Sequence, residues 1–222
     1  MIPILTAGLA PAIALLCFFY LKDDFEQEPI YMVFRSFLFG ALLVFPILFI
    51  QFALNEEGFV TSVYKEVFVQ TALIEEFLKW FIVLLTVYHH IHFNERYDGI
   101  VYATAVALGF ASAENVLYLL ANGLETAFLR AVFPVSSHAL FGVLMGYYLG
   151  KAKFYPEKQY FYLALSFFYP YLLHSLYNFI LLTQSRWIYM LTPFMIFLWF
   201  LGLRKIKKAN QNQGSYFRKN IA

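Results

Sequence analysis

Seven stretches of this chain are each long and apolar enough to cross a lipid bilayer, and this feature constrains the fold more than any other. A spanning helix needs about 20 largely apolar residues. Little of the 222-residue chain remains outside these stretches, so the sequence predicts an all-α fold. That fold is a polytopic transmembrane helix bundle forming one domain over residues 1–222. The predicted spans are Ile2–Leu21, Ile30–Leu54, Glu66–Tyr88, Asp98–Leu120, Ala127–Gly150, Tyr160–Leu182 and Trp187–Leu203.

The composition supports a membrane environment and excludes several classes of protein. Hydrophobic residues make up 61% of the chain, against about 45–50% in soluble domains. The formal net charge of +2 gives no indication of nucleic-acid binding. The single Cys17 can form neither an intrachain disulfide nor a cysteine metal cluster. The lipid bilayer is therefore the expected surrounding, and no nucleic acid is expected as a partner.

The distribution of Lys and Arg predicts the orientation in the membrane. Positive residues outside the spans favour the cytoplasmic side. Residues 203–222 form a basic tail with six Lys and Arg residues, and the loops on the same side raise the total to eleven. The other side has three. We therefore expect a multi-pass protein of the cell membrane with its C-terminus, including the basic tail, in the cytoplasm and its N-terminus outside.

The third predicted span carries three charged residues, Glu75, Glu76 and Lys79, near its middle. Each charge within a membrane costs about 2.5–3.5 kcal/mol on insertion scales. Glu75 and Lys79 are four residues apart and share a helix face, so an ion pair can offset one carboxylate. Glu76 then needs a partner from another helix. A structural salt bridge is one interpretation, but ionisable groups inside membranes usually serve function.

Three other spans supply polar groups that can meet these charges. Counted at 1.5 Å per residue from the predicted span ends, Glu75 and these groups lie roughly 6 to 16 Å from the extracytoplasmic surface. Hydrogen bonding between helices is the simpler explanation for any one of them. Their agreement in depth favours one shared site in the outer half of the membrane. They are Glu114 and Asn115 in the fourth span, His138 in the fifth, and His174 and Asn178 in the sixth.

Carboxylates, imidazoles and an amide in a half-buried cavity suit hydrolysis. A desolvated glutamate can act as a base, while imidazole and carboxamide groups can polarise a carbonyl and stabilise its oxyanion. The chain has no H-E-x-x-H helix, so the sequence favours a water activated without a cofactor. Zinc remains possible, because it accepts His and Glu ligands. Its candidate ligands are Glu75, Glu76, Glu114, His138 and His174.

The same residues carry a resemblance to a known family. The segments are "YLKDD" with Glu28 and Pro29, "EEFLK", "ERYDGIVYATAVALGFASAEN", His138 and "HSLYN". In this order they resemble the PrsW family of bacterial intramembrane proteases over essentially the whole chain. That family shares a clan with the CAAX prenyl endopeptidases. CAAX enzymes commonly carry F-x-x-x-H where this chain has Phe110 and Glu114, so their mechanism does not transfer whole.

The resemblance implies a peptidase that makes the first (site-1) cut in a membrane-spanning, RsiW-like anti-sigma factor. A second, site-2 protease would act on the product, leading to sigma-W activation. By position in the motifs, the resemblance implies catalytic roles for Glu75, Glu76 and His174, with His138 and Asn178 as further candidates. Supporting roles fall to Lys79, Glu95, Glu114 and Asn115.

Two alternatives belong to other functional classes. The ionisable residues could form a proton or cation path in a small transporter, since Asp, Glu and His chains serve such relays. A path across the membrane would place such groups at successive depths, whereas these gather in one half. A non-catalytic membrane scaffold of the same clan is the other alternative. Only the scaffold predicts that amides can replace the carboxylates with activity retained.

Other conspicuous residues have simpler interpretations. His89, His90 and His92 are expected in a solvated loop at the cytoplasmic end of the third span. Asp98 is expected to cap the fourth helix, and Arg35 and Arg130 to reach lipid headgroups. Small residues recur every four positions after His138, a pattern that predicts close approach of another helix. They are Gly142, Gly146 and Gly150.

Overall fold

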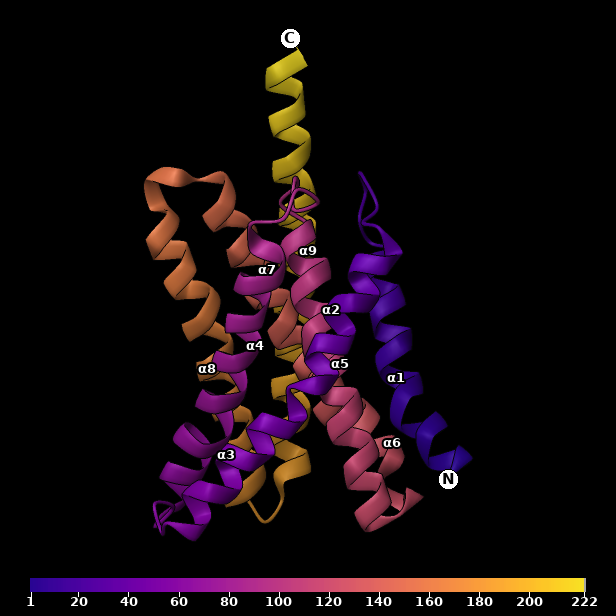
Figure 1. Ribbon diagram of the computed structural model, residues 1–222, viewed down its shortest axis with the longest axis vertical. Helices are drawn as coiled ribbons and strands as arrows, with labels where there is room; N and C mark the ends of the chain where they lie inside the picture. Colours follow the sequence, from indigo (N-terminus) through magenta and orange to yellow (C-terminus); the bar gives the residue numbers. More distant parts are fainter. Residues whose placement is uncertain (222) are drawn as a thin grey trace.

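The computed structural model describes residues 1–221, with side chains through Gln213, and its described part consists of helices and connecting turns. The predicted all-α fold is confirmed. Most helices run along the long axis of the molecule, and the two chain ends lie at opposite ends of it (Figure 1). Ala222, and the tail side chains that include Arg218 and Lys219, lie outside what the structure describes.

Helices account for all seven predicted spans. The α-helices are α1 (Ile2–Tyr20), α2 (Ile30–Leu42), α3 (Val44–Glu56), α4 (Ile74–Val83), α5 (Asp98–Asn122), α6 (Ala127–Arg130), α7 (Ser136–Phe154), α8 (Gln159–Thr183) and α9 (Trp187–Ile221). The π-helices are η1 (Lys65–Leu73), η2 (Leu84–Tyr88) and η4 (Ala131–Val135), and the 3₁₀ turns are η3 (Leu124–Thr126) and η5 (Pro156–Lys158).

Within the described residues, six of these helical segments are long and apolar enough to cross a membrane, so the chain is a multi-pass membrane protein. The third predicted span is also helical, as η1, α4 and η2 in succession, but its charges distinguish it from the six. The second span divides at Leu43 into α2 and α3. The last helix continues beyond Leu203, because residues 204–213 contain no proline or glycine to end it.

α5 forms the centre of the bundle, and every residue from Asp98 to Ser112 is buried. Glycines let neighbouring backbones come close on two of its sides. A Cβ atom added to Gly40 of α2 would lie 2.0 Å from the carbonyl oxygen of Val106, and one added to Gly146 of α7 would lie 2.0 Å from that of Gly99. The predicted close approach along α7 is confirmed, with α5 as the partner helix. This contact fixes His138, which lies on the same ridge.

Gly146→Ala is expected to destabilise the bundle by at least about 1–3 kcal/mol, the usual effect of overpacking. The added methyl group would meet backbone atoms of α5, which cannot rotate away. Gly202→Ala is the matched control, because its methyl group would meet the end of the Leu140 side chain at 2.7 Å and that side chain can move. Unfolding of both variants in detergent micelles measures the difference. Equal stability of the two variants would contradict this account of the α5–α7 contact.

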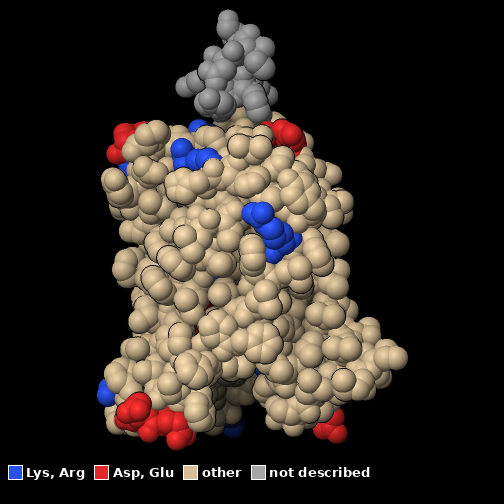
Figure 2. Space-filling model, viewed as in Figure 1, with Lys and Arg blue, Asp and Glu red and all other residues tan. Residues whose placement is uncertain are grey.

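The surface matches a membrane protein. Figure 2 shows charged side chains gathered mainly at the two ends of the molecule, and the broad region between them carries one basic group on this face. Large apolar side chains are exposed, for example Phe45 and Phe49 of α3, at 67% and 72%. Such exposure suits contact with lipid chains.

Candidate active site

The three charged residues of the third span are buried inside the bundle at the start of α4. The ammonium Nζ of Lys79 lies 2.6 Å from Oε1 of Glu76 and 3.7 Å from Oε2 of Glu75. The sequence pointed to Glu75 as the main partner of Lys79, whereas the structure gives the shorter contact to Glu76. Lys79 also lies over the ring of Phe110 on α5, 4.5 Å from its centroid, so its ammonium points into the bundle.

Histidines from two other helices complete this cluster. Nδ1 of His174 on α8 lies 2.9 Å from Oε1 of Glu76 and forms a hydrogen bond with it. His138 on α7 has Nδ1 3.3 Å from Nζ of Lys79. The two imidazole rings are perpendicular, with centroids 5.1 Å apart. Glu76 thus receives the second partner that its burial requires, and that partner is His174.

The arrangement includes three groups that could bind one metal ion. Glu75, His138 and His174 are all buried, and each offers a ligand atom within 4.8 Å of the other two. Oε2 of Glu75 is buried and has no hydrogen-bond partner among the described residues. Two imidazoles and a carboxylate are a ligand set that zinc accepts. The residues present therefore fit such an ion.

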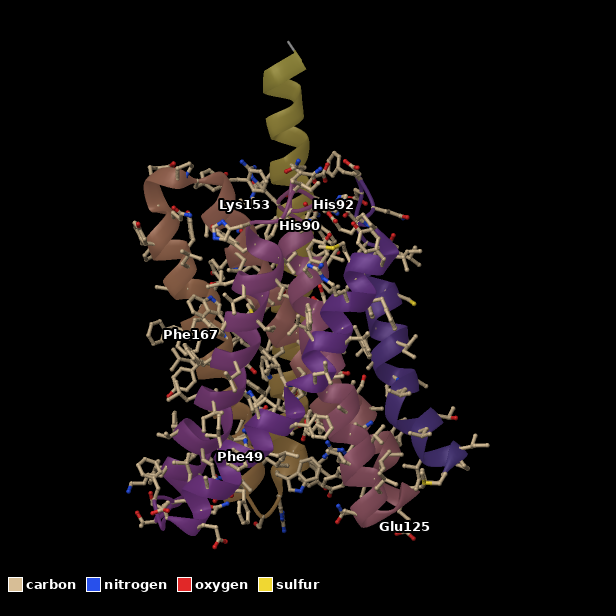
Figure 3. The ribbon with its side chains drawn as sticks, viewed as in Figure 1. Phe49, His90, His92, Glu125, Lys153 and Phe167 are labelled. Carbon is tan, nitrogen blue, oxygen red and sulfur yellow. The ribbon has the colours of Figure 1, made fainter. Side chains whose placement is uncertain are left out.

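A cavity of about 710 Å³ reaches this cluster from one side. Its walls come from α3, η1 and α5, and both Glu75 and Glu114 line it. Phe49 of α3 lies in the half of the molecule that holds the N-terminus, away from the end at which α9 projects (Figure 3). The cavity thus opens onto two carboxylates of the cluster.

Glu114 and Asn115 join the cluster to α6. One oxygen of Glu114 lies 3.3 Å from Nε2 of His138, and the other lies 3.2 Å from an Nη atom of Arg130. Nε of Arg130 donates to Oδ1 of Asn115 at 2.7 Å, and Asn115 donates to the carbonyl of Gly8 on α1. The prediction that Arg130 contacts lipid headgroups is therefore wrong. Arg130 follows the connection between two antiparallel spans, and this position in the sequence could have indicated a contact with the end of α5.

Two predicted site residues lie apart from these contacts. Asn178 is one helical turn beyond His174 and half-buried, and it makes none of the hydrogen bonds found among the described residues. Glu95 precedes α5 at the opposite end of that helix from Glu114. Burial, followed by the charge of Asp23, raises the pKa of Glu95 to about 7. A supporting role for Glu95 would therefore act from the far end of α5.

The structure around Glu95 also tests the predictions made for Asp98 and for the histidines of the nearby loop. Oδ2 of Asp98 accepts hydrogen bonds from the backbone N–H groups of Asn94 and Glu95, at 2.7 and 2.5 Å. Asp98 therefore holds the turn before α5. The prediction that it caps the first turn of this helix is wrong, because α5 has no side-chain hydrogen bond at its N-cap. His90 and His92 lie at this end of the molecule, together with Lys153 and far from Phe49 (Figure 3). They are separate from the candidate site.

Ionisable side chains from four helices, buried in a membrane bundle and reached by a cavity, define a membrane-embedded hydrolase. The chain belongs to the PrsW family of intramembrane metalloproteases, whose family model matches residues 28–203. It is therefore a peptidase, and the resemblance noted in the sequence is confirmed. No solved structure gives a significant match to the chain.

Curated relatives match over nearly their whole length. Protease PrsW of Geobacillus kaustophilus is 56% identical over 209 residues, covering 94% of this chain and 93% of the relative. Protease PrsW of Bacillus subtilis is 54% identical over 210 residues, covering 94% and 96%. A more distant relative, protease PrsW of Clostridioides difficile, is 34% identical over 211 residues, covering 90% and 88%.

Proposed function

We propose that this peptidase makes the first, site-1 cut in a single-pass, RsiW-like membrane anti-sigma factor on its extracytoplasmic side. A site-2 protease would then act on the membrane-bound product, and sigma-W activation would follow. The observation that carries this proposal is the buried group of Glu75, His138 and His174 beside an open cavity. Membership of the PrsW family supports the same reaction class.

The proposed orientation places the C-terminus in the cytoplasm. Lys153 lies at the end of the molecule from which α9 projects (Figure 3), and the basic tail begins within that helix. Positive residues favour the cytoplasmic side. The cavity wall that includes Phe52 of α3 lies toward the other end. In this orientation the candidate site belongs to the outer half of the membrane.

We propose that Glu75, His138 and His174 hold a zinc ion, in preference to the metal-free site that the sequence favoured. The family description as metalloproteases and the three converging ligands support this choice. The ammonium of Lys79 lies beside Glu75 and His138, and the carboxylate of Glu76, 2.6 Å from it, offsets the repulsion that it would exert on a bound cation. When bound, zinc would polarise the scissile carbonyl and make water a stronger nucleophile.

The surrounding residues hold the ligands and move the proton. Glu76 accepts from Nδ1 of His174, which leaves Nε2 as the nitrogen with a free lone pair. Lys79 balances the charge of Glu76 at 2.6 Å. Glu114 lies beside His138 and lines the cavity, so its carboxylate can take a proton from water there. Asn178, one turn from His174, would donate to the oxyanion.

The position of the cut tests the proposed function. A peptide bond must leave its helix to reach a protease, because helical backbone is shielded by its own hydrogen bonds. We therefore expect cleavage at or just outside the substrate's extracytoplasmic membrane boundary. Co-expression with a tagged RsiW-like anti-sigma factor in cells without the site-2 protease should accumulate a membrane-bound stub, and terminal sequencing gives the cut. A cut at the cytoplasmic boundary, or no cut, would contradict the proposal.

A further inference from the structure

The cavity in front of Glu75 is a groove with one wall of mixed polarity and one polar wall. α3 contributes Val44, Ile47, Leu48, Gln51, Phe52 and Asn55. These positions recur at helical spacing, so one face of α3 forms a wall from end to end. The opposite wall comes from Glu66, Gln70 and Thr71 of η1. At 1.5 Å per residue the α3 wall is roughly 16 Å long, and an extended chain at 3.3 Å per residue would place about five residues along it.

α3 is attached to the bundle differently along its length. Its buried residues are Val44 and Ile47, both in its first half. In its second half a reciprocal pair of hydrogen bonds joins it to η1, which we call the glutamine clasp. Nε2 of Gln51 donates to the backbone carbonyl of Gln70 at 3.2 Å, and Nε2 of Gln70 donates to that of Gln51 at 3.0 Å. Gln51 also lies 3.4 Å from Oε1 of Glu75.

Each half of this clasp is a carboxamide bonded to a main-chain carbonyl. A peptide segment in extended form presents the same N–H and C=O groups along its length. Within a membrane these groups must find partners, since each unsatisfied group costs several kcal/mol. Gln70 also lies in the π-helix η1, a conformation frequent at functional sites. The amides of the clasp can thus exchange one main-chain partner for another.

We propose that an extended segment of a single-pass substrate, about five residues long at the rise of a strand, binds between α3 and η1 and pairs with the amides of Gln51 and Gln70. The clasp opens as the segment enters, and the scissile bond comes to Glu75, which lines the groove beside Gln51. This inference rests on the proposed function, because it names how that substrate reaches the site. It assigns Gln51 and Gln70 as substrate-positioning residues.

A rival binding place exists on another side of the bundle. A second cavity, of about 430 Å³, lies between α1 and α2 and is lined by apolar side chains with Cys17 and Tyr20. Its walls include Phe34, which is 60% exposed. It offers neither carboxamide nor carboxylate side chains to a peptide backbone, and it does not reach Glu75. It serves as the comparison site for a test by cross-linking.

A photo-reactive side chain in place of Leu48, which lines the groove, is expected to cross-link to substrate. Phe49 is the matched position, because it is the next residue of α3, is 72% exposed and does not line the groove. Phe34 reports on the rival cavity. The protein would carry Glu75→Gln so that a tagged RsiW-like anti-sigma factor is held but not cut. We expect at least tenfold more adduct from position 48 than from positions 49 and 34.

Other cross-linking results would overturn either the groove as binding site or the proposed function. Equal adduct from positions 48 and 49, or the strongest adduct from position 34, would overturn the groove as binding site. The same holds if no position gives adduct while the wild-type protein cuts this substrate. If the wild-type protein does not cut it in the membrane, the proposed function itself fails, and this inference fails with it.

A kinetic measurement tests the clasp separately. Gln70→Leu is expected to raise KM about two- to tenfold with kcat little changed, the effect of losing a hydrogen bond worth roughly 0.5–1.5 kcal/mol. A merely structural role would lower the folded fraction or kcat instead. Gln184→Leu is the control, since Gln184 follows α8 and bonds to Thr183 outside the groove. Unchanged KM in Gln70→Leu would overturn the role of the clasp.

Discussion

Glu75→Gln is expected to reduce cleavage by at least about 10²-fold, because it removes a ligand of the proposed zinc ion, which would supply several kcal/mol of transition-state stabilisation. The two side chains have nearly the same shape, so the substitution removes the charge and keeps the packing. Glu75 is buried and has an oxygen without a hydrogen-bond partner among the described residues. Its ligand atom lies within 4.8 Å of those of His138 and His174. The rate of cut-product formation by purified protein in lipid vesicles measures the effect.

Glu125→Gln provides the control for this experiment. Glu125 lies in η3, is exposed, and does not line the cavity. It has no place among the converging ligands of the described residues. We expect cleavage close to the wild-type rate, with both variants inserted and folded alike. Wild-type cleavage by Glu75→Gln, or equal losses in both variants, would remove Glu75 from its assigned role.

Lys79→Met is expected to destabilise the protein by about 3–5 kcal/mol, the effect of leaving one charge of a buried ion pair without its partner. Lys79 and Glu76 are both 1% exposed, and their contact is 2.6 Å. Glu76 would keep its hydrogen bond to His174 but lose its counter-charge. Unfolding in mixed micelles gives the free energy of unfolding.

The double variant Lys79→Met with Glu76→Gln separates this effect from simple loss of packing. Removing both charges restores the balance between Lys79 and Glu76 and leaves only Glu75, 3.7 Å from the ammonium in the wild type, without that partner, so part of the lost stability should return. The glutamine can still accept the hydrogen bond from His174. A double variant as unstable as Lys79→Met alone would show that the ammonium acts through packing against Phe110 and not through the charge of Glu76.

Local apolar pattern was enough to predict the helices, and shared depth was enough to predict that polar groups of four spans lie near one another. Glu75, Glu76, His138 and His174 illustrate this, since each interrupts an apolar run at a similar distance from one surface. The choice of partner within the group could not be predicted. Whether Lys79 turns toward position 75 or 76 depends on the rotation of α4 against α8, which no local pattern encodes.

The contacts that could not be predicted from the sequence depend on how whole helices are tilted against one another. Gln51 and Gln70 are 19 residues apart, and their pairing requires α3 to break from α2 at Leu43 and lean against η1. Two amides within otherwise apolar spans were the available signal. Arg130 meets Glu114 because α6 folds back beside the end of α5. The path of that turn also lies beyond sequence pattern.

Zinc content and cleavage, measured together on the purified protein before and after chelation, test whether Glu75, His138 and His174 hold a zinc ion that cleavage requires. We expect about one zinc ion per chain at a site with three protein ligands, loss of both zinc and cleavage with chelator, and recovery of both when zinc is returned. His174→Ala should lower the zinc content without chelator, because it removes a ligand from the converging group. Full cleavage by protein freed of zinc would rule out the zinc site.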